Sequence, residues 1–130
     1  MVEKQIIDPG WPAYEAYPEF KPGIRIGDVL YISGCGGADP RDGSLPVGMK
    51  AQARKALDNM KEVVEAAGGS MDNVVETIIF ITDMASAGEV YEVNPEYFSA
   101  RSPITGTLVE IKSLALEGML IEIHGRAILD

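Results

Sequence analysis

Hydrophobic residues recur with a helical period in the middle of the chain and with strand patterns on either side of it. From Gly48 to Ala67 an apolar residue stands at every third or fourth position, and Gly68-Gly69 ends the run. This spacing predicts one amphipathic helix. The next segment, Val74–Asp83, is β-branched and mostly apolar on both faces, which predicts a central strand covered on at least one side by that helix. A weaker helical pattern over Ala85–Phe98 predicts a second helix, disturbed in its middle by Pro95.

The C-terminal part of the chain predicts two further strands, Thr107–Lys112 and Leu120–Leu129, joined by a short connection. Side chains alternate between the two faces of a strand. Glu122, His124 and Arg126 therefore share one face of the last strand, at spacings of about 7 Å. That face carries an acid, the only histidine of the chain and a cation.

The first third of the chain predicts shorter elements. A short apolar start at Gln5–Ile7 is followed by two β-rich runs, Gly23–Asp28 and Val29–Ser33, which fit a hairpin that turns at Gly27-Asp28. The glycines at positions 34, 36, 37 and 43 then interrupt the strand pattern, so a loop is expected after Ser33. Without a long linker or an internal repeat, this order of elements predicts a single α+β domain over residues 1–130, with a sheet on one side and two helices on the other.

Four aromatic residues gather in the early loop DPGWPAYEAYPEFKPG, whose four prolines argue against a helix. The favoured interpretation is a lid over the core of the domain, because large aromatic side chains mostly serve burial. The alternative is the wall of a ligand site. The four residues are Trp11, Tyr14, Tyr17 and Phe20.

Composition narrows the classes of function. The chain has 130 residues, 46% of them hydrophobic, and a net charge of −9 from 11 basic and 20 acidic residues, which argues against nucleic acid as the main partner. No apolar run approaches the roughly 18 residues of a membrane span. The N-terminus also lacks the apolar stretch of a signal peptide. With a single cysteine, a reducing cytoplasm is the expected location.

No cofactor or metal is predicted. One histidine, one cysteine and scattered acids lack the spacing of metal ligands. Neither the GxGxxG nor the GxxxxGK[ST] pattern of phosphate-binding loops is present. Cys35 has no histidine near it in sequence, so a small buried residue is favoured over a nucleophile.

Three segments together resemble the Rid/YjgF/UK family of imine and enamine deaminases, also described as endoribonuclease L-PSP. The segments are VLYISGCGG, QARKALDNMKEVVEAAGGSMDNVVETIIFITDM and TLVEI with LIEI near the end, and the similarity extends from about Pro22 to Ile128. The resemblance implies a chorismate-mutase-like α+β fold, a mixed sheet with two helices packed on one face. It also implies a homotrimer with small-molecule ligand sites in the clefts between subunits.

The resemblance further implies which residues form the site. The family's strand glutamate, which positions or activates water, falls on Glu122, and the Ser-Gly at a strand end falls on Ser33-Gly34, followed by Cys35. The early aromatic residue of the pocket falls on Phe20, with Tyr17 nearby as a substitute. All of these are predicted to bind substrate, and Glu122 is predicted to be catalytic.

The arginine with which the family's deaminases hold a substrate carboxylate has no counterpart here. The matching segment is Pro103-Ile104-Thr105-Gly106-Thr107, so Thr105 or Gly106 occupies its place, and Arg101 lies in the wrong register. A charge-assisted bond contributes about 1.5–3 kcal/mol, against about 0.5–1.5 kcal/mol for a neutral hydroxyl. A 2-imino acid is therefore expected to bind poorly or by another group.

Several groups are candidates for the missing anion contact. Thr105, Gly106 and Thr107 are predicted to contact substrate. Arg101 and Arg126 are candidate replacement cations. Backbone N–H groups at positions 34–37 and 106 could form an anion nest without any cation.

Two interpretations of the Glu122 row remain open. In the first, Glu122 delivers water to a C=N carbon, with His124 assisting or binding substrate near neutral pH. In the second, Glu122 forms a structural ion pair with Arg126, and His124 is a hydrogen-bonded core or interface residue. The predicted function is a trimeric imine or enamine deaminase with altered substrate preference. The alternative is a non-catalytic trimer that binds a metabolite or a protein in the same cleft.

Overall fold

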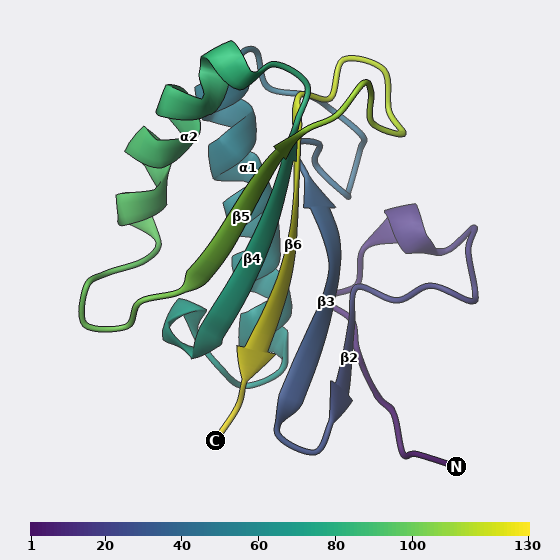
Figure 1. Ribbon diagram of the computed structural model, residues 1–130. Coiled ribbons are helices and arrows are strands. Elements are labelled where there is room, and N and C mark those ends of the chain that lie inside the picture. Colours follow the sequence, from purple (N-terminus) through teal and green to yellow (C-terminus); the bar gives the residue numbers. More distant parts are fainter.

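Six strands form one mixed sheet in the computed structural model, which describes all 130 residues (Figure 1). The strands lie in the order β1-β2-β3-β6-β4-β5. Only β4 and β5 run parallel, and the other neighbours are antiparallel. Their bounds are β1 Gln5–Ile7, β2 Gly23–Ile26, β3 Val29–Gly36, β4 Val74–Ile81, β5 Thr105–Glu110 and β6 Ile121–Ile128.

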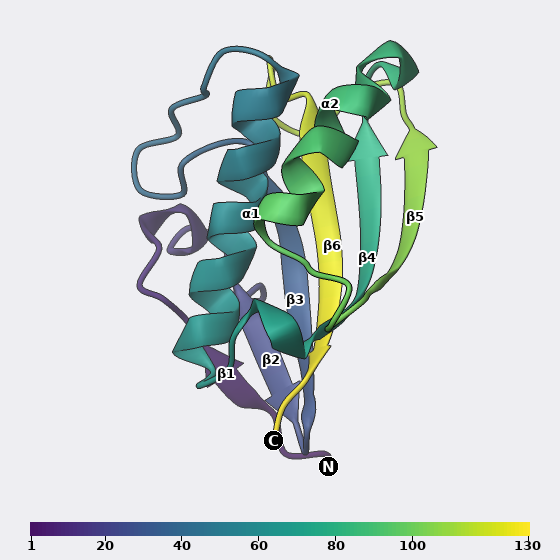
Figure 2. The ribbon, with the colours of Figure 1, turned by 90° about the vertical axis from the view of Figure 1, so that its left-hand side faces the viewer.

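Two helices, α1 (Met49–Ala66) and α2 (Ala87–Val93), pack on the same face of this sheet (Figure 2). Helix α1 has the predicted bounds, because Gly68 takes the left-handed conformation (φ +88°) that ends a helix. Helix α2 is shorter than predicted, because a proline at position 95 cannot continue the backbone hydrogen bonding, and one 3₁₀ turn follows at Asn94–Glu96. The predicted fold of two helices on one face of a mixed sheet is confirmed.

The hydrophobic core lies between α1 and the sheet. The buried face of α1 includes Ala53, Leu57, Met60 and Val64. On β6 the residues facing this layer include Gly125, where an added Cβ atom would lie 2.6 Å from the Met60 Cε atom. Because position 125 has no side chain, α1 can approach the central strand closely.

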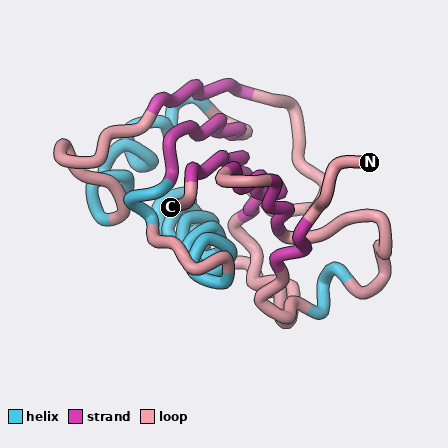
Figure 3. The backbone as a smooth tube through the Cα atoms, turned by 90° about the horizontal axis from the view of Figure 1, so that it is seen from below, coloured by secondary structure: helices cyan, strands magenta, loops and turns pink.

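The opposite face of the sheet carries no helix, as the view from below also shows (Figure 3). The register of β4 and β6 pairs Phe80 with Glu122, Ile78 with His124, and Glu76 with Arg126. The predicted alternation along β6 is confirmed, since its residues 121, 123, 125 and 127 are buried and 122, 124 and 126 are half-buried. Glu122, His124 and Arg126 of β6 therefore lie on the uncovered face.

Two details of the strands differ from the prediction. Strand β3 does not end at Ser33 but continues to Gly36 through a bulge, in which Ser33 and Gly34 together stand opposite one residue of β6. The strand predicted at Thr107–Lys112 is β5, which spans Thr105–Glu110 and pairs with β4, so that it is not a neighbour of β6. Parallel pairing between distant segments leaves no local signal in the sequence.

A buried glutamine on α1 holds the loops at the end of the sheet. The Gln52 Nε2 atom donates to the carbonyl oxygens of Pro46 (3.2 Å) and Gly118 (3.1 Å), and its Oε1 atom accepts from the Leu120 N–H group (2.8 Å). These bonds fix the chain just before β6 begins.

We predict that Gln52→Met lowers the free energy of unfolding, because it removes the partner of three part-buried backbone groups, and each such hydrogen bond contributes about 0.5–1.5 kcal/mol. Urea unfolding followed by circular dichroism measures the loss. The matched control is Gln5→Met, since the side chain of Gln5 is exposed. Equal stability of the two variants would contradict the assigned role of Gln52.

Candidate functional site

A cleft of about 600 Å³ opens where the early aromatic loop meets the ends of β3 and β6. A deeper cavity of about 410 Å³ shares much of the same wall. Glu122 lines both spaces. The lining residues common to the two are Ala13, Tyr14, Tyr17, Gly34, Ala115 and Glu122.

The Glu122 side chain lies directly over a glycine. A Cβ atom added at Gly34 would stand 2.7 Å from both Cδ and Oε2 of Glu122. No other residue leaves room for the carboxylate, which explains a glycine at the bulge of β3. Glu122 forms no ion pair and no hydrogen bond within the chain, so both carboxylate oxygens are available to a ligand or to water.

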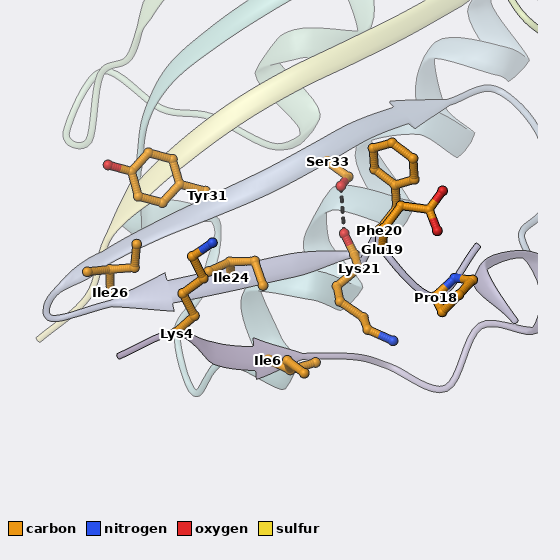
Figure 4. Close-up of a pocket in the computed structure, with 10 residues that line it drawn as sticks. All are labelled: Lys4, Ile6, Pro18, Glu19, Phe20, Lys21, Ile24, Ile26, Tyr31 and Ser33. Carbon is orange, nitrogen blue, oxygen red and sulfur yellow. Dashed lines mark hydrogen bonds between the residues drawn. The ribbon is translucent and has the colours of Figure 1, made fainter. Parts of the chain in front are cut away.

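Ser33 attaches the aromatic loop to the sheet. Its Oγ atom donates to the carbonyl oxygen of Lys21 (2.6 Å), and its N–H group donates to the carbonyl oxygen of Pro22 (2.9 Å). Figure 4 shows the first of these bonds at the edge of a neighbouring groove. This groove, of about 590 Å³, shares Phe20 and Ser33 with the cleft, so the two hollows adjoin on the uncovered face.

The aromatic loop serves both of the roles that were weighed for it. Trp11 is 5% exposed and belongs to the core, as the lid interpretation requires. Tyr17 and Phe20 are 56% and 58% exposed and line the cleft. The structure therefore brings Tyr17, Phe20 and Ser33-Gly34 together with Glu122, as expected from the resemblance.

Tyr14 is a site residue that the sequence analysis did not single out. Burial raises the pKa of its hydroxyl, a contact with the Ser33 hydroxyl opposes this shift, and the neighbouring Cys35 and Glu122 add to it. The hydroxyl therefore stays protonated at neutral pH. The Tyr14 ring packs against Trp11 with 6.1 Å between ring centroids. The sequence does not distinguish Tyr14 from the other three aromatic residues of the loop. In the structure Tyr14 belongs to the 3₁₀ turn at Pro12–Tyr14, which directs it inward.

Cys35 lines the deeper cavity, yet it is not a nucleophile. Burial, with a smaller contribution from Glu122, raises the pKa of its thiol to about 12. The thiol donates to the carbonyl oxygen of Ser33 (3.3 Å). Because the thiolate is the reactive form, this residue is inert near neutral pH, and the prediction of a small buried residue is confirmed.

The remaining predicted residues lie outside the cleft of a single chain. Thr105, Gly106 and Thr107 lie on β5 at the edge of the sheet, separated from β6 by β4. The Thr105 hydroxyl donates to the carbonyl oxygen of Val75 (2.9 Å). His124 lies farther along β6 on the uncovered face. Their roles in substrate binding remain predictions.

The proposed structural pair of Glu122 and Arg126 is wrong. The Arg126 Nε atom lies 3.9 Å from Glu76 Oε1, and its guanidinium carbon lies 5.2 Å from the centre of the Tyr31 ring. The acid that neighbours Arg126 comes from β4, because Glu76 stands opposite it in the ladder. Glu122 therefore has no ion-pair partner within the chain.

The described chain contains no group of three or more histidine, cysteine or acidic residues that could hold a metal ion. None of its helices is both long enough and apolar enough to span a bilayer. The site is therefore built from one carboxylate, hydroxyl groups and aromatic rings.

The fold and the site together define a class of small α+β proteins with a cleft at the end of the sheet. The shared features are a mixed sheet with two helices on one face and a strand glutamate beside a Ser-Gly bulge. Residues 12–129 match the family model described as endoribonuclease L-PSP. The chain belongs to this family, which is also called the Rid/YjgF family.

Similar proteins agree with this assignment. A 2-iminobutanoate/2-iminopropanoate deaminase from Mus musculus is 34% identical over 110 residues, covering 76% of this chain and 82% of the relative. A RutC family protein from Sulfurisphaera tokodaii is 38% identical over 98 residues, covering 75% of this chain and 78% of that protein. The crystal structure of YyfA from Yersinia pestis, a Rid family protein of unknown function, superposes with a TM-score of 0.87 at 29% identity, covering 98% of this chain and 100% of that chain.

We predict that Gly34→Ala displaces the Glu122 carboxylate, because the new methyl group would overlap it. Any turnover that depends on this carboxylate should fall by about 10- to 100-fold, the scale expected when a catalytic group is misplaced by about 1 Å. Overpacking should cost about 1–3 kcal/mol of folding stability. Kinetics and thermal melting of one preparation measure both effects.

Gly88→Ala is the matched control, since no atom lies within 4 Å of a Cβ atom added there. This variant should keep full activity. Unchanged turnover in Gly34→Ala would show that the carboxylate position is not critical.

Proposed function

We propose that the protein is a deaminase-type hydrolase that acts on a C=N or enamine group of a small reactive metabolite. The proposal rests on the Glu122 carboxylate. This residue is half-buried, has no ion-pair partner and faces an open cleft beside hydroxyl groups. Membership of the family and the similarity to 2-iminobutanoate/2-iminopropanoate deaminases support it. Deamination of an imine needs one water molecule and one group that can move protons, and the cleft supplies that group.

The reaction follows from this geometry. Glu122 takes a proton from water as the oxygen attacks the C=N carbon and passes this proton to the nitrogen, so an amino alcohol forms. The same carboxylate then takes the hydroxyl proton and delivers it to the nitrogen as the C–N bond breaks, so that a carbonyl compound and ammonia leave and the carboxylate is restored. An enamine would first take up a proton at carbon to give the imine. A positioned carboxyl group can perform both transfers in sequence.

The substrate is proposed to differ from that of the family's arginine-bearing deaminases. The resemblance places Thr105 or Gly106 at the arginine position, and a substrate carboxylate would then lack its guanidinium partner. RNA is also a poor candidate, because the net charge is −9 and the cleft lining contains no cation. These observations favour a small and weakly charged ligand.

The uncovered sheet face supports a homotrimer with its ligand sites in the clefts between subunits. Apolar side chains on this face remain exposed in the single chain, which is unusual for a stable monomer. They come from all six strands, so they cover the face and are not a local patch. Exposed or half-buried members are Ile6, Ile24, Tyr31, Ile78, Phe80, Val109 and Ile128.

We predict that the purified protein sediments at three times the chain mass of 14.0 kDa. Sedimentation equilibrium measures this mass directly. Ile78→Lys should shift the mass towards that of a single chain, because it places a charge in the centre of the proposed interface. Lys61→Glu on the outer surface of α1 is the control and should leave the mass unchanged. A single-chain mass for the unaltered protein would rule out the shared site.

We predict that Glu122→Gln lowers turnover of the imine by about 100-fold or more, the usual scale for a positioned general base. Folding and assembly should be nearly unchanged, because Glu122 has no partner to lose. Glu76→Gln is the matched control on the same face, and it should alter stability slightly without affecting turnover. Full activity of Glu122→Gln would instead favour a trimer that binds its ligand without catalysis.

A further inference from the structure

The walls of the cleft carry only negative charge. Glu122 is the only ionisable group among the lining residues apart from two tyrosines, and no lysine, arginine or histidine lines the cleft. The deeper cavity adds Asp39, a second acid, which is already paired with Lys55 (3.1 Å) and Arg41 (3.7 Å). In the cleft and in the deeper cavity, the charge that has no ion-pair partner is therefore negative.

Two lysines line the neighbouring groove. Lys4 and Lys21 line the groove that adjoins the cleft at Phe20 and Ser33. Figure 4 shows the Lys21 amino group extending away from Ser33, toward Ile6 and Pro18. Neither lysine lines the cleft of the single chain, so the Glu122 carboxylate has no counter-charge among the lining residues.

The hydrogen-bonding groups of the cleft are also mainly acceptors. The Ser33 proton is used by the carbonyl oxygen of Lys21, so the Ser33 oxygen can only accept further bonds. The ionised carboxylate of Glu122 accepts at both oxygens. The side-chain donors are the hydroxyls of the two lining tyrosines, Tyr14 and Tyr17, and the Tyr14 hydroxyl contacts Ser33.

The back of the deeper cavity adds one more acceptor. The Asn59 Nδ2 atom donates to the carbonyl oxygens of Gly36 (3.1 Å) and Ala38 (2.9 Å), which fixes the orientation of the amide. Its Oδ1 atom is buried and has no donor, while the Asn59 side chain is 3% exposed. Because this oxygen is covered, it adds to the acceptor character of the cavity wall but does not itself contact a ligand.

We infer that the cleft binds the nitrogen end of its ligand as an N–H donor, neutral or protonated, and disfavours a carboxylate next to it. The substrate class is then a small imine, enamine or amidine-like compound without an adjacent acid group. A carboxylate would meet Glu122 as a like charge and would find acceptors where it needs donors. An iminium N–H group would meet both a counter-charge and a set of acceptors. The substrate class rests on the proposed function, whereas the binding preference does not require turnover.

Benzamidine and benzoate test this preference, because they share one planar shape and differ in charge and hydrogen bonding. Trp11 is the only tryptophan, lines the deeper cavity and packs against Tyr14, so its fluorescence reports binding. Titrations at pH 7 and low salt should give a Kd for benzamidine at least about tenfold below that for benzoate, as expected when the sign of one partly screened charge pair is reversed. Isothermal titration calorimetry provides a second readout.

Three variants locate the preference. Glu122→Gln should remove most of the difference between the two ligands, and Glu76→Gln should keep it. Tyr14→Phe should leave benzamidine the tighter ligand, because it removes a hydroxyl and leaves the Glu122 charge in place. Benzoate binding as tightly as benzamidine, or neither ligand binding at millimolar concentration, would overturn the inference.

The outcomes separate this inference from the proposed function. If Glu122→Gln abolishes imine hydrolysis but leaves the ratio of the two dissociation constants unchanged, the function stands and the inference fails. If the ratio depends on Glu122 while the protein hydrolyses no imine, the binding preference stands and the enzymatic assignment fails.

Discussion

The position of β6 between β3 and β4 is the constraint on which the site depends. This strand is hydrogen-bonded on both sides, and its side chains alternate between the helical core and the uncovered face. A slip of one residue would place Glu122 in the core and Ile123 in the cleft, at a large cost in desolvation. The burial of Ile121, Ile123 and Ala127 therefore fixes the direction of the Glu122 carboxylate.

Helix α1 completes the site from the covered side of the sheet. Gln52 fixes the chain that enters β6, and Asn59 fixes the chain that leaves β3. One helix thus holds both strand ends that border the cleft. This explains why two amides occupy buried positions on an otherwise apolar helix face, since each satisfies backbone groups that the loops would leave unpaired.

Much of the fold could be predicted because its signals are local. The period of α1, the β-branched run of β4 and the turn at Gly27-Asp28 each follow from neighbouring residues, and all three agree with the structure. The parallel pairing of β5 with β4 could not be predicted, because it depends on contacts between distant segments.

The candidate site could be predicted only in part. The side-chain alternation gave the direction of Glu122 on β6, and the resemblance suggested Ser33-Gly34 and Phe20. Tyr14 was not distinguished from the other aromatic residues, because only the fold of the loop decides which ring turns inward. The pairing of Arg126 was mistaken because its acid lies across the ladder, on β4, and not two residues away on its own strand.

The edge strands of the sheet influence how readily the protein aggregates. Its two edge strands are β1, which has three residues, and β5, which has six and carries Thr105, Thr107 and Glu110. Short or polar edges are poor templates for the addition of another strand. The apolar surface lies instead on the broad face of the sheet, away from both edge strands. The backbone groups at the sheet edges are therefore poor starting points for a fibre, although the broad face is apolar.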